Sequence, residues 1–70
     1  MFNKKYTEAL KILNDEIDLA HGLAVEYNGL AKVIKSDSVR EWHLQKSNEW
    51  HYRYMALLEL KTQLKKKIGV

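Results

Sequence analysis

The sequence predicts an all-α protein, an antiparallel two-helix hairpin that assembles into an oligomeric helical bundle. Three observations predict this fold. The 70 residues contain no proline and three glycines, a composition that favours long helices over strands. Apolar residues recur at helical spacing in both halves of the chain. One break, at residues 35–38 (Lys-Ser-Asp-Ser), separates the two patterns, and so short a linker makes antiparallel neighbours the default.

The first helix is expected at about residues 4–35. Its apolar residues step alternately by four and three, the spacing of a coiled-coil seam: Tyr6, Leu10, Leu13, Ile17, Ala20, Ala24, Tyr27, Ala31 and Ile34. A second row lies beside this seam: Ile12, Leu19, Leu23, Leu30 and Val33. Together the rows span roughly 160° of the helix circumference, wider than the ~100° stripe that packs against one core. Because one facing helix cannot shield this arc, we expect copies of the chain to associate.

The second helix is expected at about residues 38–67. Ser38 with Glu41 three residues later fits a capping box, and Asp37 is the alternative cap. The apolar side of this helix gathers Val39, Trp42, Trp50, Tyr54, Leu57, Leu60, Leu64 and Ile68. The polar side opposite gathers Glu41, Asn48, Glu49, Glu59, Gln63 and Lys66. This helix is therefore amphipathic as well.

The chain length predicts a single domain, residues 1–70. Domains this small bury a marginal core and usually need disulfides, a metal or oligomerisation as a supplement. The sequence has no cysteine, which excludes disulfides and thiolate metal sites. Oligomerisation is the supplement that remains.

The net charge of +3 is unevenly distributed. Residues 1–35 carry five basic and five acidic side chains, whereas residues 36–70 carry seven basic and four acidic ones. An anionic partner is therefore expected to meet the second half. The lysines at 61 and 65–67 are equally explained by the helix dipole, which favours cations in a last turn. Without a recognisable nucleic-acid fold or an arginine-rich stripe, a nucleic-acid partner is not expected.

The location of the protein follows from what the sequence lacks. No apolar segment follows the charged N-terminus, so a secretory signal is not expected. No apolar run approaches the ~20 residues of a membrane span. We expect a protein of the cytoplasm, or of the host cytoplasm if it is viral, without membrane contact.

The most informative cluster for function combines aromatic and basic side chains of the second helix: Trp42, His43, Lys46, Trp50, Arg53 and Tyr54. Lys46 and Arg53 fall within the apolar arc, where an unpaired ion is costly. Their aliphatic stems can snorkel to water, the cations can lie over the indoles, or they can pair with Glu16 or Glu26. They can also bind a phosphate beside aromatic faces able to stack a base. All four explanations are consistent with the sequence.

Catalysis and metal binding find little support. His21, His43 and His51 lack the i, i+4 spacing of a helical metal site. Ser47 lies one turn from His43 and from His51, but nothing in the sequence predicts an oxyanion hole or a sheltered pocket for a serine nucleophile. We expect a non-enzymatic protein with no metal and no cofactor.

Three segments resemble a known family. Residues 13–19 (Leu-Asn-Asp-Glu-Ile-Asp-Leu) and 29–34 (Gly-Leu-Ala-Lys-Val-Ile) are similar to the first helix of the phage anti-CBASS cyclic-nucleotide sponges. Residues 50–58 (Trp-His-Tyr-Arg-Tyr-Met-Ala-Leu-Leu) resemble their second helix. The resemblance implies an oligomer of helical hairpins that sequesters cyclic-oligonucleotide immune signals between protomers through aromatic and basic side chains. The family's N-terminal Gly-Tyr-Arg stretch has no counterpart here, so no individual binding residue is transferred.

Two functions are consistent with these observations. The first is an oligomeric sponge for an anionic, nucleotide-type signalling molecule, in which Trp50 and Tyr54 stack a base and Lys46 and Arg53 contact phosphate. Trp42 and His43 would line that site. The alternative is a small viral inhibitor or adaptor that presents an aromatic helix face to a host protein.

Overall fold

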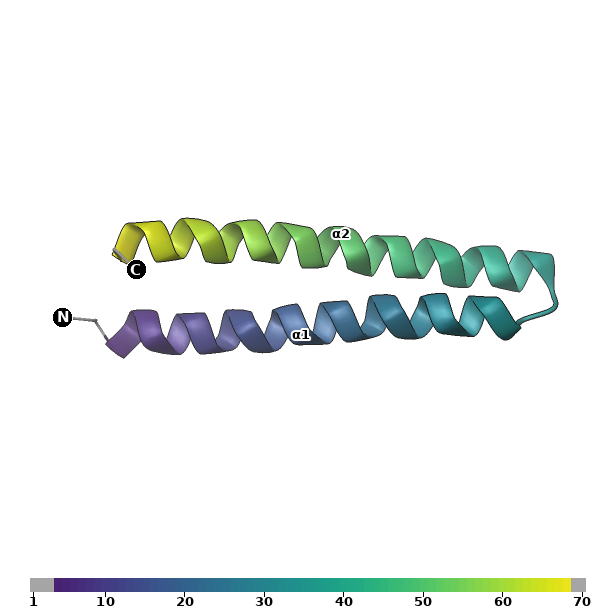
Figure 1. Cartoon of the computed structure of the whole chain (residues 1–70), viewed down its shortest axis with the longest axis horizontal. Helices are drawn as coiled ribbons and strands as arrows, with labels where there is room; N and C mark the ends of the chain where they lie inside the picture. Colours follow the sequence, from purple (N-terminus) through teal and green to yellow (C-terminus); the bar gives the residue numbers. More distant parts are fainter. Residues whose placement is uncertain (1–3, 69–70) are drawn as a thin grey trace.

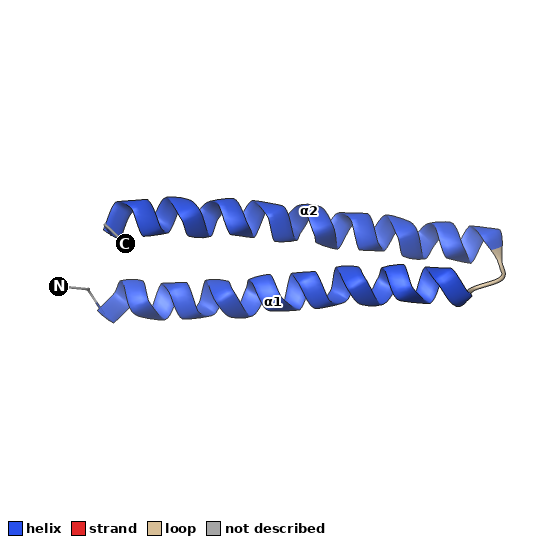
Figure 2. Ribbon diagram, viewed as in Figure 1, coloured by secondary structure: helices blue, strands red, loops and turns tan. Residues whose placement is uncertain are grey.

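The computed structural model describes residues 4–68, which form two helices, α1 (Lys4–Val33) and α2 (Asp37–Ile68). The helices run antiparallel and side by side, and a short loop at residues 34–36 joins them (Figure 1, Figure 2). The molecule measures 54 × 15 × 12 Å. The predicted helical hairpin is confirmed. No helix within residues 4–68 combines the length and hydropathy that crossing a membrane requires.

The backbone hydrogen bonds around the loop fix where α2 begins. The Ser36 carbonyl accepts the first bond of α2 from the Arg40 amide at 2.9 Å, which makes Ser36 the N-cap residue. The predicted capping box is wrong, because Ser38 and Glu41 both lie inside the helix. Asp37 is the first helical residue and not the cap, and its carboxylate lies 3.3 Å from the Arg40 guanidinium.

The guanidinium of Arg40 also closes the C-terminus of α1. Its Nε and Nη2 atoms each donate to the Ile34 carbonyl at 3.2 Å, and Nη2 reaches the Lys35 carbonyl at 3.4 Å. These two carbonyls lie in the loop just after α1, where no helix supplies them with a partner, so a side chain of α2 provides the donors. Arg40 therefore stabilises the turn through its bonds to the loop carbonyls and through its contact with Asp37 at the start of α2.

The core of the hairpin consists of small side chains on α1. Among the described residues the buried apolar ones are Ile17, Ala20, Ala24 and Ala31, all at predicted seam positions. Ala20 is only 1% exposed. Alanines at such positions let the two helices approach closely. This packing confirms the seam of α1 from Leu10 to Ala31 but gives a core of little volume. At the ends of the predicted seam, Tyr6 is exposed and Ile34 lies in the loop after α1.

The seam of α2 differs from the predicted apolar side. One row of its half-buried residues steps by three and four: Arg40, His43, Ser47, Trp50, Tyr54, Leu57, Lys61 and Leu64. Lys46, Leu58 and Lys65, beside this row, are half-buried as well. Trp50, Tyr54, Leu57 and Leu64 confirm the prediction, whereas Val39, Trp42 and Leu60 are exposed. The side chain of Ile68 lies outside the described residues.

The residues at the loop end of the hairpin show why the seam of α2 differs from the predicted apolar side. There α1 presents Ala24 and Ala31, and the short or polar side chains of Ser47, His43 and Arg40 stand in the α2 seam beside them. Trp42 lies one position before the seam residue His43, and helical spacing therefore leaves its indole on the flank.

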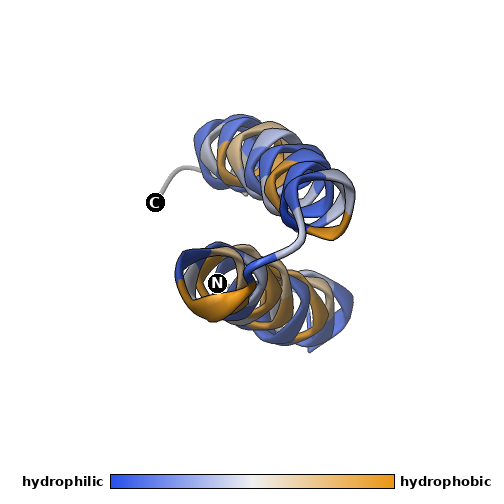
Figure 3. Ribbon diagram, turned by 90° about the vertical axis from the view of Figure 1, so that its right-hand side faces the viewer, coloured by the Kyte–Doolittle hydropathy of each residue, from blue (hydrophilic) through white to orange (hydrophobic). Residues whose placement is uncertain are grey.

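The second apolar row of α1 is not covered by α2. Ile12, Leu19, Leu30 and Val33 are exposed, and Leu23 is half-buried. Figure 3 shows hydrophobic ribbon on α1 also on the side turned away from α2. The accessible surface of 5632 Å² exceeds by about 1,000 Å² the value of about 4,600 Å² typical of a folded monomer of 8.3 kDa. The hairpin thus leaves an unusually large part of its surface uncovered.

Candidate functional site

A groove runs along one side of the seam in the loop half of the hairpin. Its volume is about 340 Å³. It is lined by Tyr27 of α1 and by five residues of α2: Trp42, Lys46, Glu49, Trp50 and Arg53. The α2 residues are spaced by three and four or are direct neighbours, which places them on one face of the helix. We call this set the aromatic–basic groove.

Two cations of the groove lie over indole rings. The Lys46 ammonium is 5.5 Å from the centroid of the Trp42 ring, and the Arg53 guanidinium carbon is 5.4 Å from that of Trp50. Such pairs contribute about 0.5–1 kcal/mol each at exposed sites. Of the explanations that the sequence left open, the structure shows cation–π pairing for both residues.

A carboxylate stands within the groove beside Lys46. The Lys46 ammonium lies 3.2 Å from Glu49 Oε2, one helical turn away. The sequence placed Glu49 on the opposite, polar side of the helix, and this prediction is wrong. Within residues 4–68, Lys46 and Arg53 form no ion pair with Glu16 or Glu26, because Glu49 and the indoles lie nearer along their own helix.

Tyr27 is the one contribution of α1 to the groove. Its ring meets Trp42 nearly edge-on, with centroids 5.9 Å apart and an interplanar angle of 78°. It also lies 5.9 Å from the His43 ring, and Trp42 and His43 are themselves 4.9 Å apart. Sequence reasoning counted Tyr27 as a seam residue and missed this role. The available signal was its aromatic ring among the alanines of the seam.

The predicted site residues divide between two sides of the seam. Trp42, Lys46, Trp50 and Arg53 line the aromatic–basic groove, and His43 borders it through its ring contacts. The structure does not bring Tyr54 into this groove. Helical spacing explains the difference: Tyr54 is itself a seam residue, four positions after Trp50, and its ring turns to the side where His51 lies.

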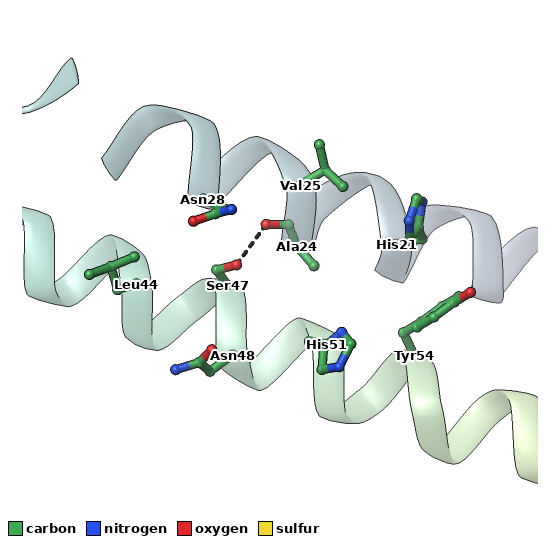
Figure 4. A pocket seen from close by; sticks show the side chains of 9 residues that line it. All are labelled: His21, Ala24, Val25, Asn28, Leu44, Ser47, Asn48, His51 and Tyr54. Atoms are coloured by element: carbon green, nitrogen blue, oxygen red, sulfur yellow. Dashed lines mark hydrogen bonds between the residues drawn. The ribbon is translucent and has the colours of Figure 1, made fainter. Parts of the chain in front are cut away.

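Tyr54 lies instead in a second groove, of about 380 Å³, on the other side of the seam (Figure 4). Its ring centroid is 5.1 Å from that of His21 and 6.2 Å from that of His51. The remaining lining residues are uncharged: Ala24, Val25, Asn28, Leu44, Ser47 and Asn48. The two grooves share no lining residue, and only the aromatic–basic groove has fixed charges.

Ser47 lies in the second groove, with its hydroxyl engaged in the fold. Its Oγ donates to the Ala24 carbonyl at 2.7 Å, so this proton is not directed at His43 or His51 (Figure 4). The described residues also contain no group of three or more His, Cys, Asp or Glu side chains able to hold a metal ion.

Comparison of the chain with protein-family models, with curated proteins and with solved structures found no match.

Proposed function

We propose that the aromatic–basic groove binds an anionic, base-containing small molecule, and that the protein acts without catalysis as an oligomeric sponge for a nucleotide-type signal. The carrying observation is the pair of cation–aromatic contacts, Lys46 over Trp42 and Arg53 over Trp50, in one groove. Each pair sets a phosphate-binding cation against a flat ring able to stack a base.

The groove suits a ligand that has both a charge and a ring. Arg53 offers a planar fork for bidentate contact with a phosphate, and Lys46 offers a point charge. Trp50 stacks the base, while Trp42, His43 and Tyr27 form the aromatic wall at the loop end. A phosphate would replace the Glu49 carboxylate as the partner of Lys46. Glu49 thus holds the cation in place when no ligand is bound.

Self-association completes this proposal. Leu23 and Leu30 of the uncovered row directly precede the seam residues Ala24 and Ala31. Lys46 and Arg53 likewise directly precede seam residues of α2. In an antiparallel pair these equivalent positions lie on the same side of the seam, so the two leucines flank it beside Lys46 and Arg53. The surface excess of about 1,000 Å² is close to the ~800 Å² that each partner of a standard interface buries. A second copy that covers this row therefore also borders the groove and shields its ligand from water.

Calorimetry against a panel of cyclic dinucleotides, cyclic trinucleotides and cyclic ADP-ribose-type signals tests the function. We expect one class to bind, and we expect Lys46→Ala and Arg53→Ala each to weaken its binding tenfold or more. Lys32→Ala is the matched control, because it removes the same charge from an exposed position outside the groove. Absence of binding across the panel, or equal affinities in all variants, overturns the proposal.

A second candidate function, a protein-interaction module, is favoured by one further observation. Tyr52 is 74% exposed on α2 and does not line the aromatic–basic groove, and Trp42, which lines the groove, is 49% exposed. Exposed aromatic side chains are typical anchors of protein interfaces. Tyr52→Ala discriminates the two functions: binding of a protein partner would weaken in this variant, whereas nucleotide binding in the groove would not change.

A further inference from the structure

The antiparallel fold brings the lysines from both ends of the described chain together. The open end of the hairpin, residues 4–11 and 58–68, carries Lys4, Lys5, Lys11, Lys61, Lys65, Lys66 and Lys67 (Figure 1). We call these seven residues the basic end. Glu8 and Glu59 are the only acidic residues in the same two segments, so their net charge is +5. Residues 12–57 between them carry five basic and seven acidic side chains, a net charge of −2.

The register of the helices sets these lysines at the same level. The contacts that join the helices pair Tyr27 with Trp42, Ala24 with Ser47 and His21 with Tyr54, so each residue of α1 lies near the level of the α2 residues whose numbers bring the sum to about 69–75. Lys4 and Lys5 then lie near the level of Lys65, Lys66 and Lys67. All seven lysines fall within two helical turns, a band of roughly 10 Å at ~1.5 Å per residue. The sequence contains two separate groups of lysines, and the antiparallel fold brings them together into a single group.

This arrangement is unfavourable for the hairpin itself. The first turn of α1 contains Lys4 and Lys5 and no acidic residue, although the positive end of the helix dipole favours carboxylates there. Within residues 4–68, Lys66 and Lys67 form no ion pair, and the pairs Asp37–Arg40 and Lys46–Glu49 lie in the other half of the molecule. Departures from local stability rules concentrate at functional sites.

We propose that the basic end binds the phosphate backbone of a nucleic acid, without reading its bases. Duplex DNA carries one negative charge per ≈1.7 Å of its axis, and lysines that contact its phosphates release condensed counterions. A backbone that crosses the side of the hairpin near its end meets lysines of both helices. The aromatic–basic groove lies in the other half of the molecule and is not involved.

A membrane surface fits the same charges less well. A flat anionic surface that meets the tip reaches Lys4 and Lys67, but Lys11 and Lys61 lie about 9–10 Å further along the helices. A surface that lies along the whole hairpin also meets residues 12–57, whose net charge of −2 is repelled by anionic lipids. A polyanion of small cross-section avoids both problems.

The experiment measures fluorescence anisotropy of a labelled 20-base-pair duplex and of a 20-nucleotide single strand, at 50 to 200 mM salt. The test variant is Lys66→Gln with Lys67→Gln. The matched control is Lys32→Gln with Lys35→Gln, which removes two charges from exposed positions at and just beyond the last turn of α1, at the far end of the hairpin. Circular dichroism verifies the helix content of both variants.

We expect the native chain to bind with a dissociation constant that rises steeply with salt. The test variant should bind about tenfold or more weakly at 50 mM salt, and for duplex the slope of log K against log[salt] should become shallower by about two. The control should stay within about twofold of the native chain. No binding of the native chain at 50 mM salt, or equal losses in both variants, overturns the proposal. Binding to phosphatidylserine vesicles but to neither nucleic acid assigns the basic end to a membrane instead and likewise overturns it.

Discussion

The hydroxyl of Ser47 on α2 donates a 2.7 Å hydrogen bond to the carbonyl oxygen of Ala24 on α1. Two features of the sequence make this contact possible. Ala24 has no side chain beyond Cβ to keep the facing helix away, and Ser47 is short enough to fit between the backbones. The bond belongs to the same register that places Tyr27 opposite Trp42 and Lys4 near the level of Lys67.

Ser47→Ala should lower the free energy of unfolding by about 1 kcal/mol, because it removes one interhelical hydrogen bond while leaving the packing volume nearly unchanged. Urea denaturation followed by circular dichroism measures the change. Thr62→Ser is the control, because it keeps a hydroxyl whose bond, to the Leu58 carbonyl, stays within α2. Equal stability of Ser47→Ala and the native chain would show that the bond does not hold the helices together.

Ala20→Leu should destabilise the hairpin by about 1–3 kcal/mol, because the position is almost fully buried and a larger side chain forces the helices apart. The control is Ala56→Leu, the same change at an exposed position of α2. Thermal unfolding of both variants measures the difference. A stabilised Ala20→Leu variant would contradict close packing along the alanine seam.

Arg40→Lys should lose about 1 kcal/mol of stability although it preserves the charge. A single ammonium cannot reproduce the contacts of the guanidinium with the carbonyls of Ile34 and Lys35. The exposed ion pair with Asp37 contributes little in comparison. Denaturation at 0.1 and 1 M salt separates the two effects, because only the ion pair is screened. A loss that disappears at 1 M salt would assign the role of Arg40 to the ion pair.

Leu19→Lys should weaken self-association tenfold or more, because it places a charge in the uncovered apolar row of α1. Val25→Lys is the matched control: Val25 is similarly exposed but lines the second groove on the other side of the seam. Sedimentation over a range of concentrations measures the assembly. A native chain that is monomeric and well folded at micromolar concentration would remove the basis of the proposed oligomer.

Glu49→Gln should raise the affinity of the aromatic–basic groove for an anion several-fold. The change removes the carboxylate that competes for Lys46 and keeps the shape of the side chain. Titration with the nucleotide selected from the panel measures the effect, and Glu59→Gln, an exposed position in the other half of α2, controls for net charge. An unchanged or lower affinity would show that Lys46 does not contact the ligand.

Part of the candidate site could be predicted from the sequence because it depends on one helix only. Trp42, Lys46, Trp50 and Arg53 share a face through helical spacing, and the cation–aromatic contacts form within α2. Tyr27 could not be assigned to the groove, since its place depends on which α2 residues lie opposite. Tyr54 was assigned to the wrong side for the same reason.

By itself the sequence determined the two helices, the break between them, the alanine seam of α1 and the uncovered row beside it, because helical periodicity and the absence of proline are properties of a single segment. Only the tertiary structure decided the register, the seam of α2, the division of the aromatic residues between two grooves and the union of two lysine groups at one end. These features depend on how closely two helices approach, and that distance follows from small side chains on both partners together. The bond between Ser47 and Ala24 depends on both helices, because it requires a small side chain on α1 and a short hydroxyl side chain opposite it on α2.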